Sequence, residues 1–231
     1  HYGDVVSERE RKVAAAGFGP MPRAESDGFV SYQWIEGRPL SASDLCSDIL
    51  VRLAEYCAFR LRAFAAELVE LNSLQKMADH NLRELGLDYT IDLCLKHPVI
   101  ADGKMQPHEW LLSTEGKLLK TDSGSHGDDH FFPGPTDIAW DLAGAIVEWQ
   151  MNDEQIEEFI ETYHRASGDD ARARIDDFIR AYAVFRAAYC LMAANAMSGS
   201  DEQPRLRRAA NGYRAVLNKT QARCIVAMHA T

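Results

Sequence analysis

The sequence predicts an α+β fold in which helices predominate. Two long segments, 43–71 and 171–197, place apolar residues at alternating steps of three and four, the spacing of one buried helix face. Residues 28–35 are instead rich in aromatic and β-branched side chains, and residues 110–122 form two apolar runs around a turn. We therefore expect a helical protein with three or four short strands near its start and one β-hairpin in its middle.

Composition and local stop signals predict the remaining elements. Further helices are expected at 4–16, 81–86, 137–149 and 206–217. Asn152 and Gln155 predict a capping box, because each side chain can bond the other's free backbone amide, and the helix that it starts should end near Ser167. The chain is expected to break around Pro204, and 89–95 could be helical or extended.

Charge and cysteine usage limit the classes of function. With 35 acidic and 25 basic residues, the net charge of -10 argues against a nucleic-acid or anionic-membrane partner, because such partners attract a basic face. No apolar run is long enough for a membrane span, and the start does not resemble a signal peptide, which favours a cytoplasmic protein. The cysteines are widely spaced and are expected to be free thiols: Cys46, Cys57, Cys94, Cys190 and Cys224.

Three acidic residues stand at the end of the predicted hairpin. Asp102 lies in the loop before it, Glu109 where it begins and Asp122 where it closes. Carboxylate oxygens are preferred ligands of Mg²⁺, and a further carboxylate can orient an attacking hydroxyl. The spacing thus predicts a phosphoryl-transfer site in which the three carboxyl groups share one cation. The alternative is that acidic residues occupy turns and hairpin ends simply because these are solvated.

The order of these parts resembles the carboxy-terminal lobe of protein-kinase-like phosphotransferases, in the aminoglycoside phosphotransferase and choline kinase branch. Residues 28–40 look like the hinge between the two lobes of that family, and the acidic hairpin looks like its catalytic loop and metal-binding hairpin. The resemblance covers most of the chain. It implies that residues 1–40 are a remnant of the amino-terminal lobe together with the hinge, whereas residues 41–231 form a helical lobe with a hairpin at 110–122.

The resemblance also implies roles in catalysis and metal binding. Asp102 would orient the substrate hydroxyl, and Lys104 lies two residues after it, as a lysine does in the protein-kinase loop. Asp122 would bind Mg²⁺, and Glu109 would join it from the place where the family has an asparagine. The usual His-Gly-Asp before the loop is absent, and the step from Asp102 to Glu109 is two residues longer than in the family.

Four other residues receive roles from the same resemblance. Trp34 and Glu36, in the hinge, would contact the nucleotide. Asp137-Ile-Ala and Asp141-Leu-Ala both look like the start of the family's Asp-Leu-Ala helix, whose aspartate braces the catalytic loop. All four tryptophans, Trp34 included, are otherwise expected to pack in the core or between lobes.

The function that the resemblance implies is transfer of a phosphoryl group from ATP, with Mg²⁺, to a hydroxyl of a small molecule. The acidic composition would suit a cationic acceptor such as an aminoglycoside or a choline-like amine. A glycine-rich phosphate loop and an early strand with a phosphate-pairing lysine are not found, so the amino-terminal lobe is expected to lie outside this chain. Glu8 or Glu10 would be the partner of that lysine.

Two alternatives remain. The altered loop favours a non-catalytic, kinase-like interaction module. His126, Asp128 and His130 also offer ligand-type side chains in a glycine-rich loop, which would suit a metal-dependent hydrolase. These residues copy the letters of the family's His-Gly-Asp motif, but Pro133 stands five residues after the aspartate, and no hairpin follows.

Overall fold

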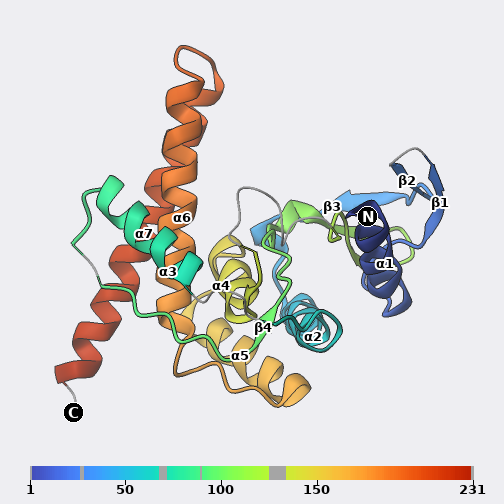
Figure 1. Cartoon of the computed structure of the whole chain (residues 1–231), viewed down its shortest axis with the longest axis horizontal. Coiled ribbons are helices and arrows are strands. Elements are labelled where there is room, and N and C mark those ends of the chain that lie inside the picture. Colours follow the sequence, from blue (N-terminus) through green and yellow to red (C-terminus); the bar gives the residue numbers. More distant parts are fainter. Residues whose placement is uncertain (1, 27–28, 68–71, 89, 125–133, 230–231) are drawn as a thin grey trace. The chain divides into compact units, whose positions relative to one another are not determined.

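The computed structural model describes residues 2–26, 29–67, 72–88, 90–124 and 134–229 (Figure 1). The chain divides into two compact units, each described by itself: residues 1–69 with 96–171, and residues 70–95 with 172–231. Within the described residues, no helix is long and apolar enough to cross a membrane. The domain boundary expected at residue 40 stays a prediction.

The first unit contains four α-helices and seven short strands among its described residues. Its helices are α1 (Tyr2–Ala15), α2 (Ser47–Ala63), α4 (Ala139–Glu148) and α5 (Asp153–Ser167), with 3-10 turns η1 (Ala42–Asp44) and η2 (Pro107–Glu109). Its strands are β1 (Pro22–Ser26), β2 (Phe29–Tyr32), β3 (Gly37–Pro39), β4 (Pro98–Val99), β5 (Trp110–Ser113), β6 (Leu118–Lys120) and β7 (Thr136–Asp137). The helix predicted at 4–16 is confirmed as α1, and that at 137–149 as α4.

The strands form three small antiparallel sheets: β1–β2, β3–β5–β6 and β4–β7. The strand predicted at 28–35 is shorter than expected and pairs with β1. The next strand, β3, lies within the predicted hinge, where Gly37 to Pro39 pair with β5. A glycine is needed at position 37, since a Cβ there would lie 2.5 Å from the carbonyl oxygen of Leu112.

Helix α2 ends earlier than its apolar stripe predicts. The stripe continues to Leu71, but the helix ends at Ala63. The carbonyl oxygen of Phe64 instead accepts from the amide of Ile100, and Ala65 forms a bridge with Val99. Pairing with the segment around β4 therefore replaces the next helical turn.

Large aromatic side chains fill the core of the first unit. Trp110, Trp140 and Trp149 are at most 2% exposed, which confirms them as core residues. Trp34 is 81% exposed and does not pack in the core, and its packing between lobes stays a prediction. The capping box predicted before α5 is confirmed, because Asn152 and Gln155 each accept from the other's backbone amide at 2.9 Å.

The second unit is helical in its described part. It contains α3 (Asn72–Glu84), α6 (Ile175–Ala196) and α7 (Glu202–His229). Helices α6 and α7 lie side by side, and α3 packs on α6 (Figure 1). Helix α3 begins nine residues before the predicted start at Asn81. Pro204 does not break the chain but lies in the first turn of α7, where its missing N–H would have no helical partner in any case.

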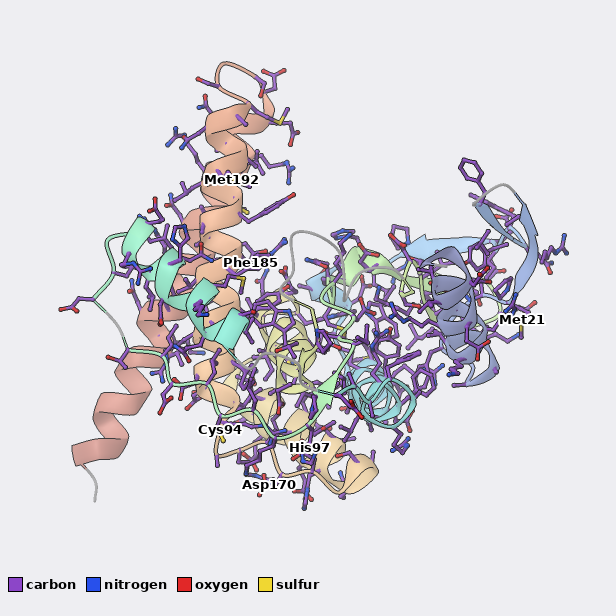
Figure 2. The ribbon with its side chains drawn as sticks, in the orientation of Figure 1. Met21, Cys94, His97, Asp170, Phe185 and Met192 are labelled. Atoms are coloured by element: carbon purple, nitrogen blue, oxygen red, sulfur yellow. The ribbon has the colours of Figure 1, made fainter. Side chains whose placement is uncertain are left out.

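The cysteines that can be assessed are free thiols. Cys57 and Cys190 are buried, and Cys46 and Cys94 are exposed. Cys94 lies in the segment between α3 and β4 (Figure 2), where residues 90–96 form neither helix nor strand. The side chain of Cys224 lies outside the described residues.

Candidate functional site

The β5–β6 hairpin brings Glu109 beside the residues that precede Asp122. Trp110 pairs with Lys120 across the two strands. The backbone amide and the hydroxyl of Thr121 donate to the carbonyl oxygen of Glu109 at 2.8 and 3.0 Å. The hairpin predicted from the sequence is confirmed, and its two ends lie side by side.

Asp141, in the first turn of α4, holds the turn at Asp102 and Gly103. Its Oδ2 accepts from the amide of Asp102, and its Oδ1 from the amide of Gly103, both at 2.8 Å. Gly103 has a φ of 72°, a left-handed conformation that favours glycine. These are the contacts that a loop-bracing aspartate would make. That the loop is catalytic stays a prediction.

Asp137 makes a different set of contacts. Its Oδ2 accepts from the amides of Lys96 and His97 at 2.6 and 2.8 Å, and its Oδ1 from the amide of Ala139 at 2.8 Å. The carboxylate therefore joins the segment before β4 to the start of α4. The sequence does not distinguish the two aspartates, and the structure assigns the contact with the Asp102 turn to Asp141.

One hydroxyl and two cations surround the side chain of Asp102. Tyr56 donates its hydroxyl to Oδ2 at 2.5 Å, Lys120 Nζ lies 3.5 Å from Oδ1, and Arg60 Nη1 lies 3.8 Å from Oδ2. All four side chains are at most 1% exposed. Burial raises the pKa of Tyr56 well above its ordinary value, so its hydroxyl keeps its proton and donates it. A buried carboxylate needs such partners, because burying a charge alone is strongly unfavourable.

Arg60 joins the Asp102 turn to the segment that follows the hairpin. Its Nη2 donates to the carbonyl oxygen of Ile100 at 2.7 Å, and its Nη1 to that of Ser123 at 3.2 Å. Its Nε lies 3.7 Å from Asp141 Oδ2. Burial raises the pKa of Asp141 to about 6, although the charge of Arg60 opposes that rise.

Glu109 and Asp122 do not gather with Asp102 around an open cation site. Glu109 Oε2 is 3.6 Å from Lys120 Nζ, so the lysine stands between Glu109 and Asp102. Asp122 is exposed and has a φ of 50°. In the part of the chain that the structure describes, no three His, Cys, Asp or Glu side chains could hold a metal ion together. The expected sharing of one cation by the three carboxyl groups is therefore wrong for this structure.

Two other predicted groups are placed only in part. The side chain of Lys104 is half-buried, and its backbone amide donates to Asp102 Oδ1 at 3.3 Å. Its catalytic role stays a prediction. His126, Asp128 and His130 lie outside the described residues, so the hydrolase interpretation also stays a prediction.

The opening helix α1 contributes a buried carboxylate. Glu10, 5% exposed, accepts from the amide of Ser123 at 3.2 Å, and Arg9 donates to the carbonyl oxygen of Gly124 at 3.2 Å. Burial raises the pKa of Glu10, while hydrogen bonds from the backbone of Gly124 and Ser123 oppose that rise. Glu8, the other residue considered as a lysine partner, is exposed. The role of either glutamate toward a lysine stays a prediction.

The sequence motifs do not predict three residues of this site: Tyr56, Arg60 and Lys120. Tyr56 and Arg60 lie one turn apart on the buried face of α2, and Lys120 ends the apolar run of β6. A cation on an otherwise apolar face is the signal that could have found Arg60 and Lys120, because buried Arg and Lys require acidic partners.

A hollow of about 540 Å³ opens beside the predicted hinge. Its lining includes Arg23, Trp34, Glu36, Ser113, Lys117 and Leu119. Trp34 Nε1 donates to Glu36 Oε1 at 2.9 Å, which orients the exposed indole. The hollow therefore offers an aromatic face together with cationic side chains.

The fold resembles that of solved choline kinases and aminoglycoside phosphotransferases. A choline/ethanolamine kinase family protein from Mesorhizobium loti is 18% identical with a TM-score of 0.58, over 98% of this chain and 78% of that one. An aminoglycoside phosphotransferase from Alicyclobacillus acidocaldarius is 14% identical with a TM-score of 0.59, over 96% and 80%. The choline kinase LicA from Streptococcus pneumoniae, in complex with AMP, is 14% identical with a TM-score of 0.51, over 92% and 79%.

These likenesses confirm the predicted resemblance at the level of the fold. No protein-family model and no curated protein matches the sequence.

Proposed function

We propose that this chain transfers the γ-phosphoryl group of ATP to a hydroxyl group of a small molecule. The observation that carries the proposal is the pair of hydrogen bonds by which Asp141 fixes the Asp102–Gly103 turn within a kinase-like fold. In phosphoryl transfer the protein acts mainly by positioning its reactants, and an aspartate in a fixed loop suits the task of orienting the acceptor hydroxyl. The small-molecule kinases that share the fold support this type of reaction.

ATP is proposed to occupy the hollow beside the hinge. Its volume of about 540 Å³ lies in the range of small-molecule pockets. Trp34 offers an exposed ring on which adenine can stack, and Arg23 and Lys117 can offset phosphate charge. The complex of LicA with AMP supports a nucleotide for this fold.

Mg²⁺ would neutralise phosphate charge in such a reaction. The described carboxylates do not fit such an ion as a group, because Tyr56 and Lys120 already contact the two oxygens of Asp102. The resemblance assigns Mg²⁺ to Asp122 and Glu109; binding by Asp122 remains a proposal, whereas Glu109 already faces the ammonium of Lys120 at 3.6 Å. No step of the proposed reaction is assigned to the ion.

An acceptor hydroxyl that bonds to Asp102 Oδ2 must first displace the hydroxyl of Tyr56. The Tyr56 hydroxyl donates to Asp102 Oδ2, which is the bond that an acceptor hydroxyl would make. Tyr56 therefore has to release this oxygen when substrate binds. The net charge of -10 supports a cationic acceptor such as an amino alcohol or an aminoglycoside.

The test compares wild type with Asp102→Asn in an ATP-dependent phosphorylation assay against choline-like amines and aminoglycosides. We expect Asp102→Asn to lower kcat by about 10²–10⁴-fold and to leave ATP affinity unchanged, because the carboxylate acts on the acceptor. Glu158→Gln, an exposed acid on α5, is the control and should retain activity. Undiminished turnover in Asp102→Asn would remove this residue from the reaction.

A non-catalytic, nucleotide-binding module is the second candidate. The full burial of Asp102 between Tyr56 and Lys120 favours it, because an occupied carboxylate is not available to an acceptor. This candidate predicts ATP binding without turnover in wild type and in Tyr56→Phe. Trp34→Ala should weaken ATP binding by about 5–150-fold in either case, which isothermal titration measures.

A further inference from the structure

Lys120 lies where a cation shared by two carboxylates would lie. Its Nζ is 3.5 Å from Asp102 Oδ1 and 3.6 Å from Glu109 Oε2. These distances are those of ion pairs and exceed those of direct hydrogen bonds. The ammonium donates its short hydrogen bond, of 2.8 Å, to the carbonyl oxygen of Thr121. One positive charge is thus held between the loop before the hairpin and the start of the hairpin.

The backbone fixes this lysine in place. Lys120 is the last residue of β6, it pairs with Trp110 across the hairpin, and its own amide donates to the carbonyl oxygen of Phe18 at 2.6 Å. Its side chain is 0% exposed. The ammonium therefore cannot move into solvent unless the hairpin moves with it.

Two of the carboxylates that meet here are each in contact with a buried cation. Asp102 and Asp141 are two buried carboxylates, and Arg60 and Lys120 are two buried cations in contact with them. Glu109 adds a third carboxylate, whose side chain is 16% exposed and thus partly solvated. A divalent ion placed between Asp102 and Glu109 would meet the ammonium of Lys120, and like charges at that separation repel strongly in a buried site.

We propose that Lys120 is a built-in cation that links Asp102 to Glu109 in place of a metal ion. The Asp102 loop and the hairpin are then assembled by the chain itself. Tyr56 completes the arrangement on the other oxygen of Asp102. The proposal is independent of whether the chain turns over ATP, because it concerns a contact that exists without nucleotide.

The experiment measures thermal unfolding without nucleotide, in MgCl₂ and in KCl of equal ionic strength. Wild type should show the same Tm in both salts. Lys120→Met removes the charge but keeps an unbranched side chain, and we expect its Tm to fall by about 6–20 °C because two carboxylates lose a cation. Mg²⁺ should then raise the Tm of Lys120→Met by about 3–6 °C at ten times its Kd, since the ion can enter the vacated position.

Two variants separate cation replacement from a merely structural effect. Lys120→Met combined with Glu109→Gln should lose the response to Mg²⁺, because one of the two ligands is gone. Lys117→Met is the matched control in the same hairpin, where the lysine is 67% exposed and paired with Glu115. It should change Tm little and show no response to Mg²⁺.

Two results would overturn the proposal. One is a rise in the Tm of wild type with Mg²⁺ that Glu109→Gln abolishes, because Glu109 would then bind metal while Lys120 is present. The other is a folded Lys120→Met protein that Mg²⁺ does not stabilise. If Lys120→Met does not fold, the test uses wild type and Glu109→Gln. The built-in cation is supported if each of these two proteins has the same Tm in MgCl₂ as in KCl. A failure of the phosphorylation assay leaves these outcomes unaffected.

Discussion

Two arginine–aspartate pairs in the first unit differ in burial. Arg38 and Asp44 make two contacts of 2.6 and 3.1 Å, with side chains 55% and 21% exposed. Arg60 and Asp141 are 3.7 Å apart, with side chains 1% and 0% exposed. Water and salt screen the exposed pair, whereas loss of one buried partner leaves a charge in apolar surroundings. We therefore expect burial, more than contact distance, to decide which pair the fold depends on.

The largest effect should come from removing the buried cation of this comparison. We expect Arg60→Met to lower the free energy of unfolding by about 3–5 kcal/mol, because two carboxylates lose their guanidinium partner. Urea unfolding measures the loss. Arg62→Met, two residues further along α2, removes an exposed arginine that donates to the carbonyl oxygen of Ala166 at 2.9 Å. An equal loss of stability in both variants would show that the burial of Arg60 does not matter.

Removing the charge of the buried carboxylate should have the next largest effect. Asp141→Asn keeps the shape but turns one acceptor into a donor that faces a backbone amide, which should cost about 1–3 kcal/mol. Hydrogen exchange should accelerate at the amides of Asp102 and Gly103. In Asp137→Asn it should accelerate instead at Lys96 and His97. Identical exchange patterns in the two variants would show that the two aspartates do not hold separate segments.

A smaller, pH-dependent effect is expected at Glu10. Because burial raises its pKa in the folded protein, the folded state binds the proton more tightly than the unfolded chain. This contribution to stability is present below the ordinary pKa of a glutamate. It is lost as the pH rises through the higher pKa that Glu10 has in the folded protein. The stability of Glu10→Gln relative to wild type should therefore increase between about pH 4 and pH 7.

Denaturant unfolding of both proteins at the two pH values measures this difference. Glu8→Gln, on the same helix, is the control, because Glu8 is more than half exposed in its contacts with Arg11 and Lys12. If Glu10→Gln instead became less stable relative to wild type as the pH rises, the inferred upward shift in the pKa of Glu10 would be wrong.

The smallest effect should come from the exposed pair. The hydrogen bond from Arg38 lowers the pKa of Asp44, so the contribution of the pair is present at neutral pH and is lost as the pH falls below about 4. Arg38→Gln should change Tm less than Arg60→Met or Asp141→Asn, and high salt should reduce the difference further. A loss as large as that of Arg60→Met, retained in high salt, would show that burial is not decisive.

The elements that local patterns specify could be predicted from the sequence. The periodic stripe of α6, the hairpin with its Ser-Thr-Glu-Gly turn, and the capping box of Asn152 and Gln155 depend on neighbours within a few residues. The resemblance to a known kind of loop also indicates that Asp137 or Asp141 braces the loop at Asp102, without deciding between them. The structure joins Asp141 to this loop through backbone hydrogen bonds.

The rest depends on contacts between distant parts of the chain. The end of α2 is decided by pairing with residues near β4, some 35 positions away, as between Ala65 and Val99. Lys120 was not predicted as a partner of Asp102 and Glu109 because strand alternation alone does not say which lysine is buried. The placement of Pro204 within α7 shows a further limit, since a proline stops a helix only beyond its first turn.

The close approach at Gly37 has a consequence for ligand selection. β3 pairs with β5, and the amide of Thr114 donates to the carbonyl oxygen of Glu36 at 2.9 Å, so the main chain of the hinge and that of the hairpin are bonded to each other. The hinge and the hairpin, which line two sides of the hollow, thus keep a constant spacing. Strands β1 and β2, the first of which carries Arg23, form a separate sheet. A ligand too thick for the spacing between hinge and hairpin would therefore be excluded. Any adjustment to the ligand would have to come from β1 and β2, where Arg23 lies.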